Sequence, residues 1–121
     1  MSKQAPADLI QGCADHAKKG DIEGWMTLFE PGAAFSSPDG DVLSGDGLRQ
    51  FVSQMAGMKP EFKMNVLKVL VAGDIALIHN EWSIPAQGMA GYGLEVARRQ
   101  ADGSWRLVID DPFTVASHYK K

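Results

Sequence analysis

The chain has 121 residues, of which 45% are hydrophobic and 22% charged, with a formal net charge of -3, one cysteine and three tryptophans. A chain of this length can fold around one core without disulfides or a structural metal, and it is too short for two cores. Its acidic balance provides no basic field for phosphate backbones, so we expect no nucleic-acid partner. We expect a single domain over residues 1–121, with an ordered core over about 7–115.

The number of cysteines and the length of the apolar runs indicate the cellular compartment. The single cysteine, Cys13, excludes a disulfide framework and a cysteine-based zinc site, which favours a reducing compartment. No apolar run approaches the roughly 20 residues of a membrane span, and the segment from Met1 to Ala7 is too polar for a signal peptide. We therefore expect a cytoplasmic protein with no membrane partner.

The first half of the chain has the periodicity of helices. Over residues 7–19, apolar side chains recur at steps of three and four, which predicts an amphipathic helix. Asp21 is placed to cap a second helix, which we expect to continue to Phe29 and to end at Glu30–Gly32. A third helix is expected over residues 46–57, after the capping oxygens of a Ser-Gly-Asp sequence.

The rest of the chain has the pattern of strands. A small hairpin is expected from residues 33–35 to 42–43, across a turn with proline and glycine. Asp102 and Gly103 form a strong hairpin signal between two further strands. The four later strands are expected over residues 61–72, 75–84, 92–100 and 104–113. Helices first and strands later predict an α+β fold with a long antiparallel meander.

Both faces of the last strand carry apolar residues, which bears on assembly. Trp105, Leu107 and Ile109 are expected on one face, and Val108 and Phe113 on or near the other. Three helices are too few to cover both faces of such a sheet. We therefore expect the outer sheet face to meet a second copy of the chain in a homodimer.

Five motifs follow one another with a family-specific spacing: Lys19–Trp25, Phe29–Phe35, Gly45–Phe51, Gly73–Leu77 and Arg98–Arg106. Nearly the whole chain, from about Ala7 to Val115, resembles the nuclear transport factor two-like superfamily, which includes SnoaL-like and ketosteroid isomerase-like proteins. The resemblance implies a cone-shaped fold whose curved sheet wraps around three helices and encloses a pocket. Because this fold hosts isomerases, dehydratases, hydrolases and transport adaptors, it does not by itself select an activity.

The ketosteroid isomerases are the sharpest comparison, and this sequence departs from them. Their catalytic base is an aspartate before a proline, where this chain has Ser37 and Pro38, and their oxyanion-binding tyrosine falls at Cys13. Their protonated aspartate falls at Glu95. An enolising isomerase needs both a base and an oxyanion donor, and two of the three positions are lost, so we do not expect steroid isomerisation.

The register of the last hairpin predicts two carboxylates opposite each other. With Asp102 and Gly103 at the centre of the turn, Glu95 pairs with Asp110, and Val108 shares their face. The resemblance likewise places Glu95 on the concave side. Asp110 and Asp111 are neighbours on a strand, so only one can face inward, and the count favours Asp110.

The preceding hairpin is expected to add two polar side chains to this pair. Centring its loop on Gly88 sets Glu81 opposite Glu95 and places His79 on the same face. Three carboxylates side by side repel one another unless one holds a proton, a cation binds, or a basic side chain neutralises part of the charge. The sequence thus predicts one cluster of His79, Glu81, Glu95 and Asp110.

Such a cluster suits acid/base catalysis or, by ligand type, a hard cation. In the first case Asp110 or Glu95 is the acid/base group and His79 its partner. The structural alternative is a solvated rim, or ion pairs with arginines at a subunit contact. The side chains expected to bind a ligand are Trp25, Phe51, Met55, Met64, Glu81 and Val108. For the aromatic and methionine side chains among them, the alternative is that they fill a solid core.

The leading hypothesis is a small-molecule-binding protein with an apolar pocket and without a cofactor or a bound metal. It would act by acid/base chemistry of the isomerase, dehydratase or hydrolase type on a small apolar or cyclic substrate. The alternative is a non-catalytic dimerisation or interaction module, whose pocket is filled by side chains. Polar side chains directed into the interior would favour the first hypothesis, because an assembly module does not need them there.

Overall fold

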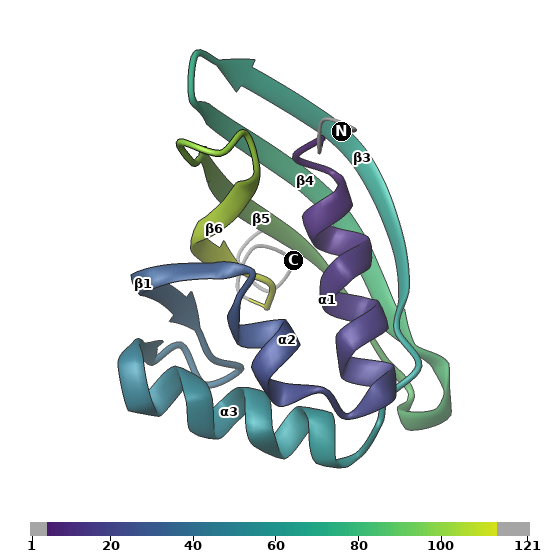
Figure 1. Cartoon of the computed structure of the whole chain (residues 1–121). Helices are drawn as coiled ribbons and strands as arrows, with labels where there is room; N and C mark the ends of the chain where they lie inside the picture. Colours follow the sequence, from purple (N-terminus) through teal and green to yellow (C-terminus); the bar gives the residue numbers. More distant parts are fainter. Residues whose placement is uncertain (1–4, 114–121) are drawn as a thin grey trace.

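The structure, a computed structural model, describes residues 5–113. Its helices are α1 (Asp8–Lys19), α2 (Ile22–Met26) and α3 (Gly45–Gly57). They pack on the concave side of a curved sheet, with α1 along its inner face and α3 crossing at one end (Figure 1), which confirms the predicted α+β fold. The core limit predicted at Val115 lies outside the described residues. None of the helices in residues 5–113 is long and apolar enough to cross a membrane.

The strands are β1 (Phe29–Ser36), β2 (Val42–Leu43), β3 (Lys63–Ala72), β4 (Ile75–Ile84), β5 (Met89–Arg99) and β6 (Trp105–Asp111). They form one sheet in the order β2-β1-β6-β5-β4-β3. The predicted meander from β3 to β6 is present and antiparallel. The parallel pairing of β1 with β6 was not predicted, and it joins the small β1–β2 hairpin to the main sheet.

The junction between α1 and α2 follows the predicted capping signals. Gly20 ends α1 in the left-handed conformation, with φ of 70°. The Asp21 side chain caps α2 by accepting a hydrogen bond from the Gly24 N–H at 2.9 Å. The second oxygen of the same carboxylate lies 3.0 Å from Nδ1 of His16, which ties the end of α1 to the start of α2.

The second helix is shorter than predicted because the chain has to join the sheet. It ends at Met26, and Phe29 begins β1. The carbonyl of Leu28 accepts a hydrogen bond from the Leu107 N–H at 2.7 Å, and this pairing with β6 outweighs the helical period. The segment Glu30–Gly32, predicted to stop a helix, is an irregular part of β1 whose glycine has φ of 82°.

The last hairpin has a longer turn than predicted. The Gln100 N–H donates a hydrogen bond to the Ser104 carbonyl at 2.7 Å, so three residues separate the closing pair instead of two. Gly103, with φ of 88°, supplies the left-handed residue that such a turn requires. By itself this longer turn would shift every pairing of β5 with β6 by one residue.

A bulge in β6 compensates for the longer turn. Ala97 pairs with Leu107, but beyond the unpaired Val108 the register changes, and Glu95 pairs with Asp110. The predicted pairing of Glu95 with Asp110 is therefore confirmed, although for a different reason. The prediction that Val108 shares their face is wrong, because Leu107 takes that place and Val108 occupies the bulge.

The predicted register of the hairpin between β4 and β5 is wrong by three residues. Glu81 pairs with Tyr92 rather than with Glu95. The prediction assumed a loop centred on Gly88, but the 3-10 turn Pro85–Gln87 places the centre of the loop earlier in the chain. Because side chains alternate between the faces of a strand, an odd shift reverses the face. His79 and Glu81 consequently lie on the outer face, away from Glu95.

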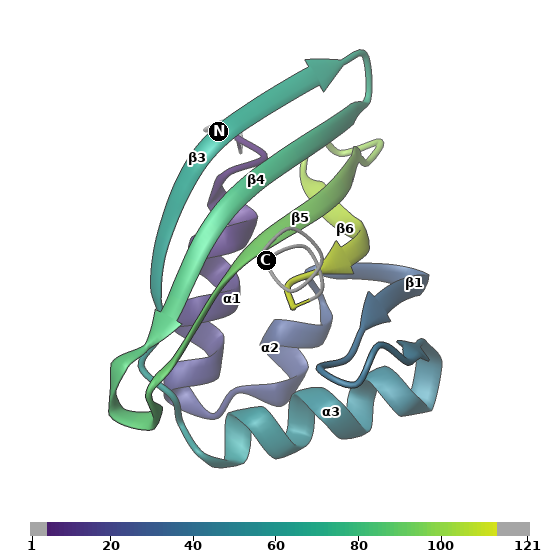
Figure 2. The ribbon, with the colours of Figure 1, turned by 180° about the vertical axis from the view of Figure 1, so that it is seen from behind.

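An apolar row crosses the outer face of the sheet. Successive pairings join one residue from each strand of the meander: Leu70, Leu77, Val96 and Ile109. Leu70 is 48% exposed and Ile109 46% exposed at the two ends of the row. The expectation that Ile109 shares a face with Trp105 and Leu107 is wrong, because the bulge at Val108 reverses the alternation. Figure 2 shows this side of β3, β4 and β5 with α1 behind it and with α2 and α3 beside and below these strands, so no helix in the described part of the chain covers it.

We predict that Gly24→Ala destabilises the fold. A Cβ at this position would lie 2.3 Å from Oδ2 of Asp21 and 2.5 Å from the His16 ring, so both side chains have to move and the Asp21 contacts that join α1 to α2 are disrupted. Loss of such a cap costs up to about 2 kcal/mol, which exceeds the roughly 0.5–1 kcal/mol that alanine gains over glycine in a helix, so the free energy of unfolding in urea should fall by about 1 kcal/mol. In the control Gly47→Ala, the Cβ meets only Leu43 at 3.8 Å, and stability should rise by about 0.5–1 kcal/mol. A similar rise in both variants would contradict the prediction.

Candidate functional site

The helices and the concave face of the sheet enclose a cavity of about 110 Å³. All three helices contribute to its wall, as do β1, β3, β4, β5 and β6. The aromatic side chains of the wall are Trp25, Phe35, Phe51, Phe62, Trp82 and Phe113. Met55 and Met64 also line it, whereas Glu81 and Val108 do not. The interior is thus a mainly aromatic and apolar space.

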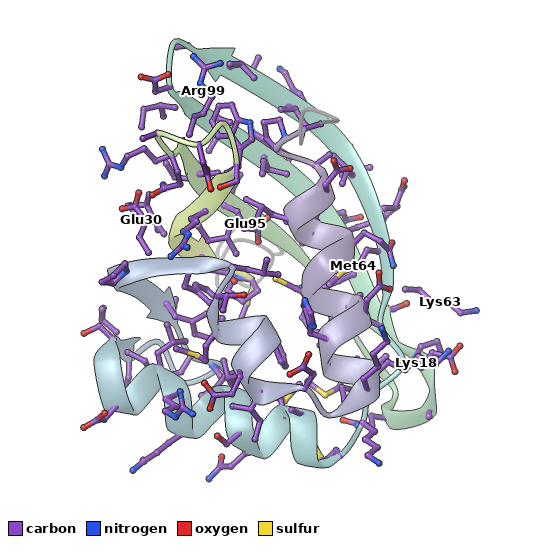
Figure 3. All side chains as sticks on the ribbon, in the orientation of Figure 1. Lys18, Glu30, Lys63, Met64, Glu95 and Arg99 are labelled. Atoms are coloured by element: carbon purple, nitrogen blue, oxygen red, sulfur yellow. The ribbon has the colours of Figure 1, made fainter. Side chains whose placement is uncertain are left out.

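Two carboxyl groups face this apolar space. Glu95 on β5 and Asp110 on β6 are directly paired and both line the cavity. Glu95 is only 3% exposed, and Figure 3 shows it between the sheet and the helices, whereas Lys63 on β3 points away from the molecule. Nδ2 of Asn80, on β4, donates a hydrogen bond to Oε1 of Glu95. A row of three polar side chains therefore crosses β4, β5 and β6 on the inner face.

The two carboxyl groups share a proton. Burial raises the pKa of Glu95 well above its usual value, and the charge of Asp110 raises it further. Burial also raises the pKa of Asp110 to about 6, although its hydrogen bond with Glu95 opposes the rise. Two carboxylates in hydrogen-bond contact in an apolar site do not both ionise readily. Burial therefore favours one proton held by the pair over two negative charges.

The side of the cavity formed by α1 and α2 carries a thiol and an indole. Burial raises the pKa of the Cys13 thiol well above its usual value, and the charges of Asp110 and Glu95 raise it further, so the thiol stays protonated and unreactive. The indole N–H of Trp25 opposes this rise in the thiol pKa as a weak donor toward the Cys13 sulfur. This buried N–H has no oxygen or nitrogen acceptor among the described residues. An unpaired buried donor costs about 1–3 kcal/mol.

Gly93 leaves room for the carboxyl group of Glu95. A Cβ at this position would lie 2.6 Å from Oε2 of Glu95 and 3.0 Å from Nδ2 of Asn80. Neither Gly93 nor Asn80 was predicted to belong to the site. A glycine inside a strand does signal a close approach by another group, and Asn80 alternates with the apolar Ile78 and Trp82. Both signals become useful only once the register of β4 is known.

An aromatic group closes the cavity near the end of β6. Nε1 of Trp82 donates a hydrogen bond to the Pro112 carbonyl at 2.7 Å. The Trp82 ring meets the Phe113 ring edge to face, with 5.5 Å between the ring centres. Phe113 also contacts Phe35 and Phe51, at 6.1 and 6.2 Å between centres. These contacts hold Pro112 and Phe113 against the cavity.

The other two members of the predicted cluster lie outside the cavity. Glu81 accepts a hydrogen bond from Nδ2 of Asn65 at 2.8 Å on the outer face. His79 pairs with Lys68 on one side and with Leu94 on the other. The structure therefore brings Glu95 and Asp110 together without His79 or Glu81. Within residues 5–113, no group of three or more His, Cys, Asp or Glu side chains is placed to hold a metal ion.

We predict that Asp110→Asn stabilises the protein at neutral pH. The folded-state pKa of Asp110 is raised from 3.8 to about 6, which means that the folded protein binds the Asp110 proton more tightly than the unfolded chain does. The resulting stabilisation is complete below about pH 4 and is lost as the pH rises through 6. The variant should exceed the wild type by up to about 3 kcal/mol near pH 7.5 and lose this advantage near pH 4, as measured by urea unfolding. The exposed control Asp39→Asn should leave the pH profile unchanged. A wild type that is the more stable at neutral pH would contradict the prediction.

Solved structures show the same fold at low sequence identity. An NTF-2 like protein of unknown function from Shewanella oneidensis MR-1 is 15% identical, with a TM-score of 0.75, over 88% of this chain and 94% of that chain. An NTF-2 like protein of unknown function from Silicibacter pomeroyi DSS-3 is 23% identical, with a TM-score of 0.71, over 88% of this chain and 89% of that chain. A protein of unknown function from Mycobacterium tuberculosis is 23% identical, with a TM-score of 0.70, over 88% of this chain and 67% of that chain.

Among the sequence comparisons, the one with curated proteins found no match, whereas the one with protein-family models agrees with the structural similarity. Residues 10–108, which include all three helices almost completely and most of the sheet, match the family model of the SnoaL-like domain. The predicted resemblance to the nuclear transport factor two-like superfamily is confirmed by this match and by the shared fold. The chain belongs to the SnoaL-like domain family.

Proposed function

We propose that the protein binds a small, mainly apolar molecule in the cavity and transfers a proton to or from it without a cofactor. One observation carries this proposal: the carboxyl pair of Glu95 and Asp110, which holds one proton, faces an otherwise apolar cavity. Efficient acid/base catalysis requires groups whose pKa lies near the working pH, and burial brings Asp110 to about 6. An interaction module would not need two such costly groups in its interior.

The two carboxyl groups have different roles in this proposal. Asp110 is ionised at neutral pH and acts as the base, whereas the protonated Glu95 acts as the acid or holds an oxygen of the substrate. Asn80 is a positioning residue, because its hydrogen bond fixes the carboxyl group of Glu95. Isomerisation, dehydration and hydrolysis all use such a pair. The free, buried thiol of Cys13 fits a cytoplasmic location.

The size of the cavity favours a small ligand. Its volume of about 110 Å³ is below the roughly 150 Å³ of an engineered apolar cavity that binds benzene. The methionines of the wall, Met55, Met64 and Met89, have adaptable side chains that can make additional room. A substrate with a single ring of five or six atoms therefore fits this proposal best.

We also propose that two copies of the chain form a homodimer through the outer face of the sheet. The apolar row from Leu70 to Ile109 is continuous over four strands, and Tyr92, which lies on the same face, is 49% exposed. A contiguous apolar surface of this kind is characteristic of protein interfaces. A second copy of the chain can cover it through a two-fold axis, because such contacts are self-complementary.

Exchange of hydrogen for deuterium tests the catalytic part. Cyclopentanone and cyclohexanone are small rings with acidic C–H bonds, and NMR in D₂O follows their deuteration. We expect catalysed exchange with at least one ketone, and a loss of about 100-fold in the rate with Asp110→Asn, because proton transfer by a positioned base contributes about that factor or more. Asp39→Asn should retain the full rate. The absence of exchange together with the absence of ligand-induced NMR shifts would contradict both binding and catalysis.

Light scattering after size-exclusion chromatography tests the homodimer. The variant Ile109→Arg places a charge in the apolar row, and we expect it to elute as a monomer while the wild type elutes as a dimer. The control Val42→Arg changes a side chain that is 75% exposed but lies on β2, away from the row, and it should remain a dimer. A wild type that is monomeric at all concentrations would disprove this assembly.

A further inference from the structure

The charge of the carboxyl pair is not balanced by the wall of the cavity. Among the described residues that line it, none is lysine, arginine or histidine. The arginines near the end of β5 are engaged at the surface: Arg98 lies 3.0 Å from Glu30, and Arg99 lies 2.6 Å from Asp74. Buried charges in proteins are normally paired, so the anionic pair leaves a requirement for a cation that this wall does not meet.

The groups that face the pair from the packed elements reinforce this requirement. Cys13 from α1 is a neutral thiol, and Asn80 from β4 is a neutral amide. Asp111, the next residue on β6, adds a further negative charge that raises the pKa of Asp110. The field at the pair is therefore negative from β6 and neutral from α1 and β4.

The aromatic wall favours an organic cation. The rings of Phe35 and Phe51 lie 4.9 Å apart between centres, and Phe113 packs against both. Trp25 and Trp82 provide two further rings in the same wall. The faces of aromatic rings carry negative potential, and they bind alkylammonium groups in aromatic cages that exclude water. A protonated amine can satisfy the carboxyl pair while its carbon atoms remain among the rings.

A third observation concerns an oxygen acceptor. Trp25 is 6% exposed and lines the cavity, and among the described residues its indole N–H has no oxygen or nitrogen acceptor, only the weakly accepting sulfur of Cys13 nearby. The indole lies beside the Cys13 thiol, which itself senses the charges of Asp110 and Glu95. A ligand that occupies this space can therefore reach both the carboxyl pair and the unpaired donor. The donor requires an acceptor, such as an ether, hydroxyl or carbonyl oxygen.

We propose that the ligand of this cavity is a small protonated amine with an apolar ring and one oxygen acceptor. Its ammonium group binds the Glu95–Asp110 pair, its ring packs against the aromatic side chains, and its oxygen accepts the indole N–H of Trp25. This inference rests on the proposed function and specifies its ligand class. The carbon atoms next to the amine are then presented to the only acid/base pair in the described cavity wall.

Matched probes test the charge requirement. Cyclohexylamine, which is protonated throughout the range used, and cyclohexanol have nearly the same shape, and calorimetric titration gives their affinities. We expect the amine to bind at least about tenfold more tightly than the alcohol near pH 7.5, and we expect this advantage to shrink near pH 5, where Asp110 is protonated. In Asp110→Asn the advantage should disappear while the alcohol still binds.

The outcomes separate this inference from the proposed function. If cyclohexanol binds as tightly as cyclohexylamine near neutral pH, the cation requirement is overturned while the small-molecule site stands. If neither probe binds, and neither shifts the thermal unfolding temperature, both proposals fail. Asp39→Asn serves as the control for a general effect of lost surface charge and should reproduce the wild-type affinities.

A second pair of probes tests the oxygen acceptor. Oxan-4-amine replaces one ring CH₂ of cyclohexylamine by an ether oxygen, and we expect it to bind the wild type at least about threefold more tightly. Trp25→Phe removes the indole N–H, and this variant should lose that preference while it keeps the preference for amine over alcohol. An equal affinity of the two amines for the wild type would overturn the acceptor requirement.

Discussion

A carboxyl group inside an apolar cavity must keep its proton or obtain a cation, and the inner face of this sheet is organised around that constraint. Glu95 and Asp110 meet across β5 and β6 and hold one proton between them. Asn80 donates to the pair from β4, and Gly93 leaves the space that the Glu95 carboxyl group occupies. The surrounding aromatic residues supply the low polarity that raises the pKa of both carboxyl groups.

The backbone supports this arrangement with two compensating irregularities. A three-residue turn shifts β6 by one residue against β5, and the bulge at Val108 shifts it back. Leu107, immediately before the bulge, is anchored on its other side by its hydrogen bond to the carbonyl of Leu28. The strand is thus held between β1 and β5 at the point where its register changes. This local anchoring explains why a helix predicted to reach Phe29 stops early.

Sequence reasoning succeeded where the determinants are local. The stripe of α1, the Asp21 cap and the Asp-Gly turn are short-range signals, and together with the family motifs they predicted the fold. The site depends on register, which is set by loop conformations that span several residues. For this reason His79 and Glu81 were placed on the wrong face, Asn80 and Gly93 were missed, and the pairing of Glu95 with Asp110 was right only because two deviations cancelled.

The bulge at Val108 also determines which of the two consecutive aspartates of β6 faces the interior. Without the bulge, strict alternation from Trp105 and Leu107 would direct Asp111 inward in place of Asp110. Two consecutive aspartates therefore offer an acidic side chain to the interior in either register. In the register without the bulge, however, Asp111 would pair with Gly93 and Ile109 with Glu95, so it is the bulge that keeps an aspartate directly opposite Glu95.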